Sequence, residues 1–231
     1  MVKELFNNSL YAGVVLSLVS YFAGVYLKKK LKWKFLNPLA VSIIISILVL
    51  VIFKLDYEVY NSSAKYLSWF LTPATVSLAI PLYERFEDLK KNSKAIMIGL
   101  LSGVVTSLFT VFVLSLVFKL NHAEYVTLLP KSVTTAIGMG ISQELGGYVT
   151  ITVAVIIITG ILGNVAGPLI CRIFRIENEI SKGLAIGCAS HAIGTAKAME
   201  LGETEGAMSS LAITVCGILT VIIAPLFASF I

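Results

Sequence analysis

The sequence has little charge. Only 13% of its 231 residues are Asp, Glu, Lys or Arg, which is about half the share found in an average soluble domain. Apolar residues make up 57% of the chain, and they gather in uncharged runs close to the roughly 20 residues that cross a bilayer. These features exclude a water-soluble globule. They predict an all-α, polytopic integral membrane protein in which residues 1–231 form a single membrane domain.

Cysteine and histidine are scarce as well. The three cysteines lie far apart, and the sequence has no C-x-x-C pair, no H-E-x-x-H motif and no G-x-S-x-G motif. We therefore expect no disulfide framework, no metal, no cofactor and no enzymatic activity. The net charge of +5 does not indicate nucleic acid, because five lysines within residues 28–34 supply it and lie between two apolar runs.

Long apolar windows are the main structural signal. The first of them follows no basic n-region, so we expect it to be kept as a span. The third contains Pro73 and Pro81, which predict a kinked or interrupted helix. Six windows predict full spans, namely 9–27, 36–53, 64–83, 95–118, 148–170 and 207–227.

Two further stretches, 129–147 and 183–206, are apolar but contain charged residues, glycines and hydroxyls. They predict broken or re-entrant helical hairpins rather than lipid-facing helices. The distribution of Lys and Arg places the basic loops in the cytoplasm and both termini outside, so that 129–147 enters from outside and 183–206 from inside. The loops expected in the cytoplasm are 28–34, 84–94 and 171–182.

Parts of the sequence match one another at a nearly fixed offset. A shift of 57 residues aligns Pro73–Pro81 with Pro130–Gly138, and a shift of 56 aligns Thr134–Gly138 with Ser190–Gly194. A duplication explains the matches, and so does chance, because alanine and isoleucine are abundant here.

The opposite orientations expected for the two polar elements favour a duplication, since many secondary transporters are built from inverted repeats. On this interpretation, residues 129–170 and 183–231 are inverted repeat units that form the core. Residues 61–128 form a first repeat-like unit, and 1–60 provides scaffold spans for oligomerisation, with a homodimer expected.

The two polar elements hold the candidate binding residues. A charged side chain at membrane depth costs about 2.5–3.5 kcal/mol, so it is expected to face protein, water or a ligand. The alternative is that Lys131 snorkels to an interface while the hydroxyls bond to the backbone. Together the two stretches predict a cationic pocket for a small organic anion. Its expected residues are Lys131, Ser132, Thr134, Thr135, Ser190, His191, Thr195 and Lys197.

Further polar residues form a second group of candidates. Glu144 and Glu200 occupy matched repeat positions and are expected to pair with the lysines, to carry protons or to lie in solvent. Asn164, Ser209 and Ser210 interrupt apolar spans, where hydrogen bonds between helices explain most such residues.

Four stretches resemble the LrgB/CidB family: Pro130–Thr135, Ala189–Ala198, Gly163–Pro168 and Gly206–Leu211. The resemblance implies a multi-pass protein of a bacterial or archaeal inner membrane, often encoded beside a small holin-like LrgA/CidA partner. It also implies a holin/antiholin system that controls murein hydrolase export and cell lysis. Plastid members exchange glycolate and glycerate, and some bacterial members have been linked to pyruvate.

Two functions are therefore expected. The first is secondary transport of a small organic monocarboxylate of the glycolate, glycerate, lactate or pyruvate type, coupled to a proton or sodium ion or to exchange for another anion. Coupling is needed because importing one negative charge costs about 2.3 kcal/mol per 100 mV of inside-negative potential. The alternative is a holin/antiholin-like membrane protein that regulates lysis with an LrgA/CidA-type partner.

Overall fold

The protein is described by a computed structural model that covers residues 6, 9–31, 36–70, 73, 76, 77, 80, 83 and 86–231. Within these residues every regular element is a helix. This confirms the all-α fold and, together with the apolar composition, a multi-pass membrane protein. Among the described residues, four helices are long and apolar enough to cross a membrane: α2 (Ala12–Leu31), α8 (Ser93–Phe118), α11 (Val149–Ile173) and α13 (Glu203–Ala228).

The count of six full spans stays a prediction. Helix α3 (Pro38–Ile52) is apolar but has only 15 residues, which gives a length of about 22 Å against a hydrocarbon core of about 30 Å. The span predicted at 64–83 begins with the 3₁₀ helix η1 (Lys65–Phe70) and continues mostly outside the described residues.

The chain forms two compact units, residues 1–77 and 78–231. The N-terminal unit contains α2, α3, α4 (Tyr57–Ala64) and η1. The backbone N–H of Gly13 donates to Ser63 Oγ at 2.8 Å, which joins α2 to α4. A Cβ atom on Gly24 would lie 2.6 Å from the carbonyl oxygen of Pro38, so glycine is needed where α2 and α3 approach. The scaffold and repeat boundaries expected from the sequence stay predictions.

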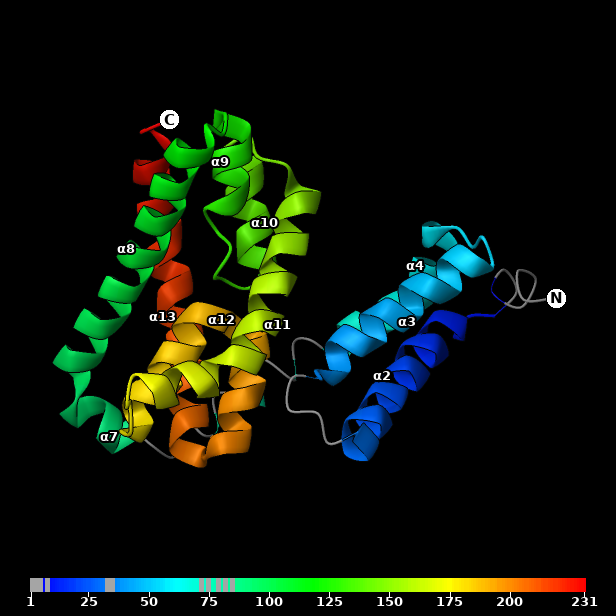
Figure 1. Ribbon diagram of the computed structural model, residues 1–231, viewed down its shortest axis with the longest axis horizontal. Helices are drawn as coiled ribbons and strands as arrows, with labels where there is room; N and C mark the ends of the chain where they lie inside the picture. Colours follow the sequence, from blue (N-terminus) through cyan, green and yellow to red (C-terminus); the bar gives the residue numbers. More distant parts are fainter. Residues whose placement is uncertain are drawn as a thin grey trace. The chain divides into compact units, whose positions relative to one another are not determined.

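The C-terminal unit has two ends that are distinguishable in Figure 1. Helices α9 and α10 lie at the end that holds the C-terminus, whereas α7 and α12 lie at the opposite end, and α8 and α13 run between the ends. The shorter helices and the kinked helix described in this unit are α7 (Phe86–Lys91), α9 (His122–Leu128), α10 (Thr135–Glu144) and α12 (Glu179–Leu201).

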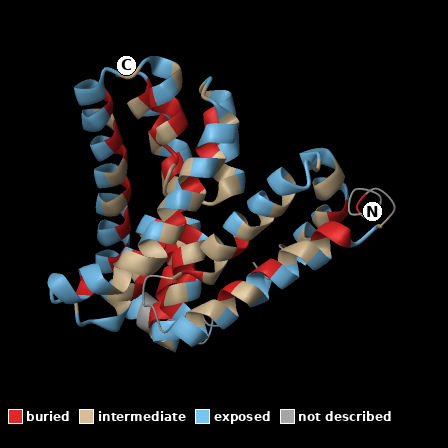
Figure 2. Ribbon diagram, turned by 45° about the vertical axis from the view of Figure 1, so that its right-hand side comes forward, coloured by how far each residue is buried: buried red, intermediate tan, exposed pale blue. Residues whose placement is uncertain are grey.

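Helix α8 is buried along one side only, as Figure 2 shows. Its buried positions recur every three or four residues, as expected for one face of a helix. They are Ile96, Leu100, Val104, Leu108, Val111 and Ser115, and all but Ser115 pack in one hydrophobic core with residues of α13 such as Ala212 and Cys216.

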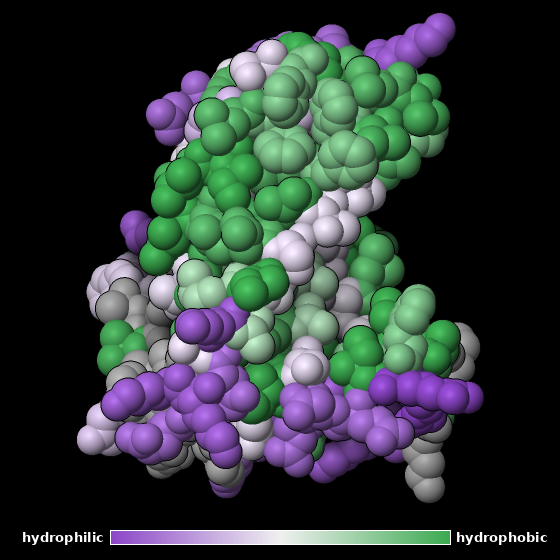
Figure 3. All heavy atoms as spheres, turned by 90° about the vertical axis from the view of Figure 1, so that its left-hand side faces the viewer, coloured by the Kyte–Doolittle hydropathy of each residue, from purple (hydrophilic) through white to green (hydrophobic). Residues whose placement is uncertain are grey.

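The exposed side of α8 is mostly hydrophobic. Figure 3 shows green hydrophobic residues over much of this side of the molecule, a pale band of weakly polar residues between them, and purple hydrophilic residues gathered at the lower end. Exposed Ile98, Phe109 and Val117 belong to α8, and such side chains suit contact with lipid.

The chain leaves helical geometry inside the first polar element. Residues 129–134 form turns between α9 and α10. Thr152 on α11 joins both short helices to its own helix, because its Oγ1 atom lies 2.9 Å from the carbonyl oxygen of Thr127 on α9 and 2.7 Å from Ser142 Oγ on α10.

The second polar element also contains a break. His191, in the middle of α12, has φ 43° and ψ −139°, so α12 is kinked there. The sequence predicts unwinding near Gly194, and the observed kink lies three residues earlier. A re-entrant path for either element stays a prediction.

Candidate functional site

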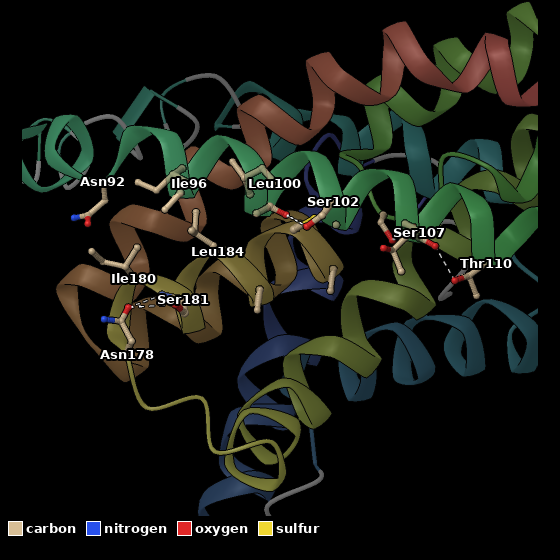
Figure 4. A pocket seen from close by; sticks show the side chains of 18 of the residues that line it. Asn92, Ile96, Leu100, Ser102, Ser107, Thr110, Asn178, Ile180, Ser181 and Leu184 are labelled. Atoms are coloured by element: carbon tan, nitrogen blue, oxygen red, sulfur yellow. Dashed lines mark hydrogen bonds between the residues drawn. The ribbon is translucent and has the colours of Figure 1, made fainter.

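A cavity of about 740 Å³ lies between α8 and α12 and reaches the turn at 129–134. Figure 4 shows its lining side chains, with Asn92 and Asn178 at one end and Ser107 and Thr110 toward the other. The α8 wall consists largely of small and hydroxyl residues. They are Gly99, Ser102, Gly103, Thr106, Ser107 and Thr110.

Three hydroxyl residues on α8 share one face of the helix because they are four residues apart: Ser102, Thr106 and Thr110. Ser102 Oγ donates to the carbonyl oxygen of Gly99 at 2.8 Å, and Thr110 Oγ1 donates to that of Thr106 at 2.7 Å. Because each hydroxyl already donates its hydrogen bond to the helix backbone, its oxygen can only accept hydrogen bonds from a group in the cavity. The α8 wall thus accepts hydrogen bonds at these positions.

Lys131 is the cation of the cavity. Its Nζ atom donates to Ser132 Oγ at 2.9 Å and to Ser107 Oγ at 3.2 Å. In the described part of the chain, no Asp or Glu side chain forms an ion pair with this half-buried ammonium group. Its hydrogen-bond partners among the described residues are therefore hydroxyls, and the positive charge remains open to an anion.

The ends of the two polar elements meet at this cavity. Ser132 from the 129–134 turn and Cys188, three residues before the α12 kink, both line it, and both also line a small neighbouring void with Cys216. A Cβ atom on Gly103 would lie 2.7 Å from Cys188 Sγ, so α8 and α12 are in close contact there.

Other predicted residues hold the kink instead of lining the cavity. Ser190, His191 and Thr195 are buried. His191 Nε2 lies 3.0 Å from the carbonyl oxygen of Ile156 on α11, and Thr195 Oγ1 lies 2.7 Å from Ser209 Oγ on α13. These bonds fix the kink between its two neighbouring helices.

Asn164 and Ser210 also bond to backbone. Asn164 Nδ2 donates to the carbonyl oxygen of Ile193 at 2.8 Å, just after the kink, and Ser210 Oγ donates to that of Gly206 at 2.9 Å. Thr134 is the N-cap of α10 and Thr135 begins that helix. Asn164 therefore holds α12 beside its kink, Ser210 bonds within α13, and the two threonines form the start of α10.

Lys197 and the two glutamates lie elsewhere. Lys197 Nζ is 2.6 Å from Glu200 Oε2, an ion pair within one turn of α12, and Glu200 is exposed. Glu144 is exposed at the end of α10. Among the predicted residues, the structure therefore brings Lys131 and Ser132 into the cavity and leaves Lys197, Glu144 and Glu200 outside its lining. Their assignment to a substrate site stays a prediction.

The α8 wall, and above all Ser107, is not among the residues predicted from the sequence. The available signal was the repeat of Ser102, Thr106 and Thr110 at intervals of four, which puts three hydroxyls on one face of an apolar span. Such hydroxyls usually bond to their own helix, so the pattern alone does not mark a cavity.

Comparisons with known proteins give one family. The model of the LrgB-like family matches residues 17–230. A protein of Bacillus cereus (strain B4264) named "Antiholin-like protein LrgB" is 39% identical over 222 residues, which cover 96% of each chain. The protein of the same name from Bacillus anthracis (strain CDC 684 / NRRL 3495) shows the same identity and coverage. No solved structure matches this chain.

Proposed function

Because the chain belongs to the LrgB-like family, we propose that it is a membrane protein whose C-terminal unit carries a small organic monocarboxylate. The observation that carries this proposal is the position of Lys131. Its ammonium group lies in a cavity of about 740 Å³ with Ser107 and Ser132 as its hydrogen-bonding neighbours. A carboxylate would neutralise this charge and complete its hydrogen bonds.

The physical chemistry of a dehydrated carboxylate supports the same proposal. Taking an ionised group out of water is costly unless an opposite charge and hydrogen-bond donors replace the lost water. Lys131 supplies the charge and its remaining N–H donor, and a charge-assisted bond of this kind is stronger than a neutral one. The cavity exceeds the size of a two- or three-carbon acid, so water fits beside the anion.

The α8 wall favours a hydroxy acid over a keto acid. Ser102 and Thr110 have donated their protons to backbone oxygens and remain as acceptors. The hydroxyl of glycolate, glycerate or lactate donates a hydrogen bond, whereas the keto oxygen of pyruvate only accepts one. We therefore rank the hydroxy acids first among the candidate substrates.

The two broken elements support a carrier built from inverted repeats. In the alignment of the two repeats, Thr134, the N-cap of α10, matches Ser190, the residue before the α12 kink. Glu144 and Glu200 align with each other and lie in the last turns of α10 and α12. Opposed broken helices with a site between them are common in secondary transporters.

Uptake by purified protein in liposomes tests the carrier. We expect labelled glycolate, glycerate or lactate to accumulate without release of a trapped dye, and Lys131→Met to abolish uptake because it keeps the side-chain length but removes the charge. Lys90→Met is the matched control, since Lys90 is exposed on α7 and lies outside the cavity. Equal uptake in wild type and Lys131→Met would overturn the proposal.

Coupling is measured in the same liposomes. An electrical gradient that is positive inside should raise uptake if the anion moves alone, whereas a proton or sodium gradient should raise it if a cation moves along. Preloading with unlabelled acid should accelerate entry if the protein exchanges anions. These three patterns distinguish the modes expected from the energy of moving one charge across a potential.

The names of the relatives favour a second function, and they do so more directly than they favour transport. Both proteins are named antiholin-like, so the second candidate is regulation of murein hydrolase export and lysis with a small LrgA/CidA-type membrane partner. Co-expression with such a partner should then change the onset of lysis, and the two should co-purify. If the Lys131→Met variant still regulates lysis but no longer takes up acid, the two functions are separate.

A further inference from the structure

A second cavity, of about 350 Å³, lies where α11 ends and α12 and α13 begin. It shares no lining residue with the cavity of Lys131. Its walls come from both ends of α12, from the last turns of α11 and the segment after it, and from the first turn of α13. They are Pro168, Cys171, Arg172, Arg175, Ile176, Glu177, Lys182, Leu201 and Glu205.

The charges of this cavity are unbalanced in favour of cations. Three basic and two acidic side chains line it. Glu205 is buried, and its Oε1 atom lies 3.9 Å from Lys182 Nζ, so these two charges face each other. Arg172 and Arg175 form no side-chain ion pair or hydrogen bond within the described residues. Apart from the pair of Lys182 and Glu205, two guanidinium groups and the exposed Glu177 line the cavity. Their net charge is positive and favours an anion.

The end of α11 fixes the two arginines on one rim. Arg175 has φ 52°, and its N–H donates to the carbonyl oxygen of Arg172 at 3.2 Å. The N–H of Ile176 donates to the carbonyl oxygen of Cys171 at 2.8 Å, which closes the helix end. The fork of a guanidinium group matches two oxygens of a phosphate or carboxylate.

Apolar groups complete the cavity, and two more lie beside it in the sequence. Pro168, Ile176 and Leu201 line it, and Ile173 and Phe174, the last residue of α11 and its C-cap, are exposed between the lining residues Arg172 and Arg175. A ligand that fits has an anionic head for the arginines and an apolar part for these surfaces. Several of the cavity's residues belong to the basic loop 171–182 that is expected in the cytoplasm. Anionic lipid headgroups are concentrated in the membrane leaflet that faces the cytoplasm.

We propose that this cavity binds a phosphate ester, the headgroup of an anionic phospholipid, through Arg172 and Arg175. The phosphodiester lies against the two guanidinium groups, and an acyl chain follows the exposed apolar residues of α11. Lys182 and Glu205 join the first turns of α12 and α13 beneath it. Asn178 and Ser181, on the same turn of α12 as Lys182, line the other cavity. Bound lipid therefore stabilises a helix that lines that cavity.

Native mass spectrometry of purified protein in detergent tests the proposal. The probes are phosphatidylglycerol, phosphatidylcholine and glycerol phosphate, and the double variant Arg172→Gln, Arg175→Gln is compared with wild type. Each basic residue near an anionic headgroup contributes about fivefold in affinity, so the double variant should bind phosphatidylglycerol about 25-fold more weakly. Lys90→Gln, Lys91→Gln removes the same charge from α7 and should bind like wild type.

The outcomes separate the ligand sources. Preference of wild type for phosphatidylglycerol over phosphatidylcholine, lost in the arginine variant, supports the lipid site. Equal binding of both lipids, or equal phosphatidylglycerol binding by both double variants, overturns it. Glycerol phosphate that displaces the lipid at equal concentration would overturn the lipid source in favour of a water-soluble phosphate ester. A wild-type melting temperature for the arginine variant in lipid-free detergent would show that the variant is folded.

Discussion

Ser107 Oγ on α8 lies 3.2 Å from Lys131 Nζ in the turn between α9 and α10. This bond joins the most polar face of a spanning helix to the cation of the cavity. The acceptors Ser102 and Thr110 on α8 line the same cavity as this ammonium group. The helix and the turn therefore form one binding surface although 24 residues separate Ser107 from Lys131.

Ser107→Ala should weaken anion binding because the ammonium group of Lys131 loses one of its two hydroxyl partners. A hydrogen bond to a charged group contributes about 1.5–3 kcal/mol, so we expect the KM of uptake to rise by about tenfold to a hundredfold while the maximal rate changes little. Ser107→Thr keeps the hydroxyl and should behave like wild type. A KM in Ser107→Ala equal to that of wild type would show that Ser107 does not position Lys131.

Gly163→Ala should destabilise the C-terminal unit. A Cβ atom there would overlap Ser190 Oγ at the α12 kink, and overpacking of this kind costs about 1–3 kcal/mol. We expect a melting temperature several degrees lower in detergent. Gly140→Ala on α10 is the control, because a Cβ atom there meets nothing within 4 Å. That change should raise stability slightly, since alanine favours helix.

The pair Gly163→Ala, Ser190→Gly extends this test. Removing the Ser190 side chain removes the atoms that the new methyl group overlaps, so the double variant should recover part of the lost stability. If the double variant loses as much stability as the two single variants combined, α11 and α12 do not meet there.

His191 should show the cost of backbone strain at the kink. Its φ of 43° with ψ of −139° suits glycine and strains any other residue by about 1–3 kcal/mol. His191→Gly and His191→Ala both lose the bond to Ile156, so their difference isolates the backbone. We expect the glycine variant to melt at the higher temperature. A higher melting temperature for the alanine variant would contradict the kink.

Cysteine labelling in intact cells should reveal the orientation of the C-terminal unit. In a chain without its three cysteines, Ser181→Cys at the start of α12 should resist an impermeant maleimide added outside and react after permeabilisation. Gln143→Cys, exposed near the end of α10, should react from outside. The reverse pattern would place the basic loops outside and contradict the predicted topology.

Much of the fold was predictable because the bilayer imposes length and apolarity. The windows at 95–118, 148–170 and 207–227 coincide with α8, α11 and α13 to within a few residues. Charge and glycine likewise marked the two stretches that contain the breaks. The kink falls at His191 and not at Gly194 because Gly160 and Gly163 on α11 give room to the side chains of His191 and Ser190, and a packing partner is not visible in the local sequence.

The candidate site was predictable only in part. Lys131 was found because a charge beside apolar spans is costly, and the cavity accommodates it. Lys197 looked equivalent, yet it pairs with Glu200 one turn further along the same helix, which needs no contact with the other element. Ser107 was missed because a hydroxyl in a span usually satisfies itself, and only the tertiary structure brings it to Lys131.

The double attachment of α12 has a mechanical consequence. Asn164 and His191 secure its kink to α11, and the bond between Thr195 and Ser209 secures it to α13. Any motion that widened the cavity of Lys131 would therefore move α11, α12 and α13 together as one rigid body. The sliding surface would then be the α8 wall, where Ser102 and Thr110 bond to their own helix and the bond between Ser107 and Lys131 is the one that would have to break or move along.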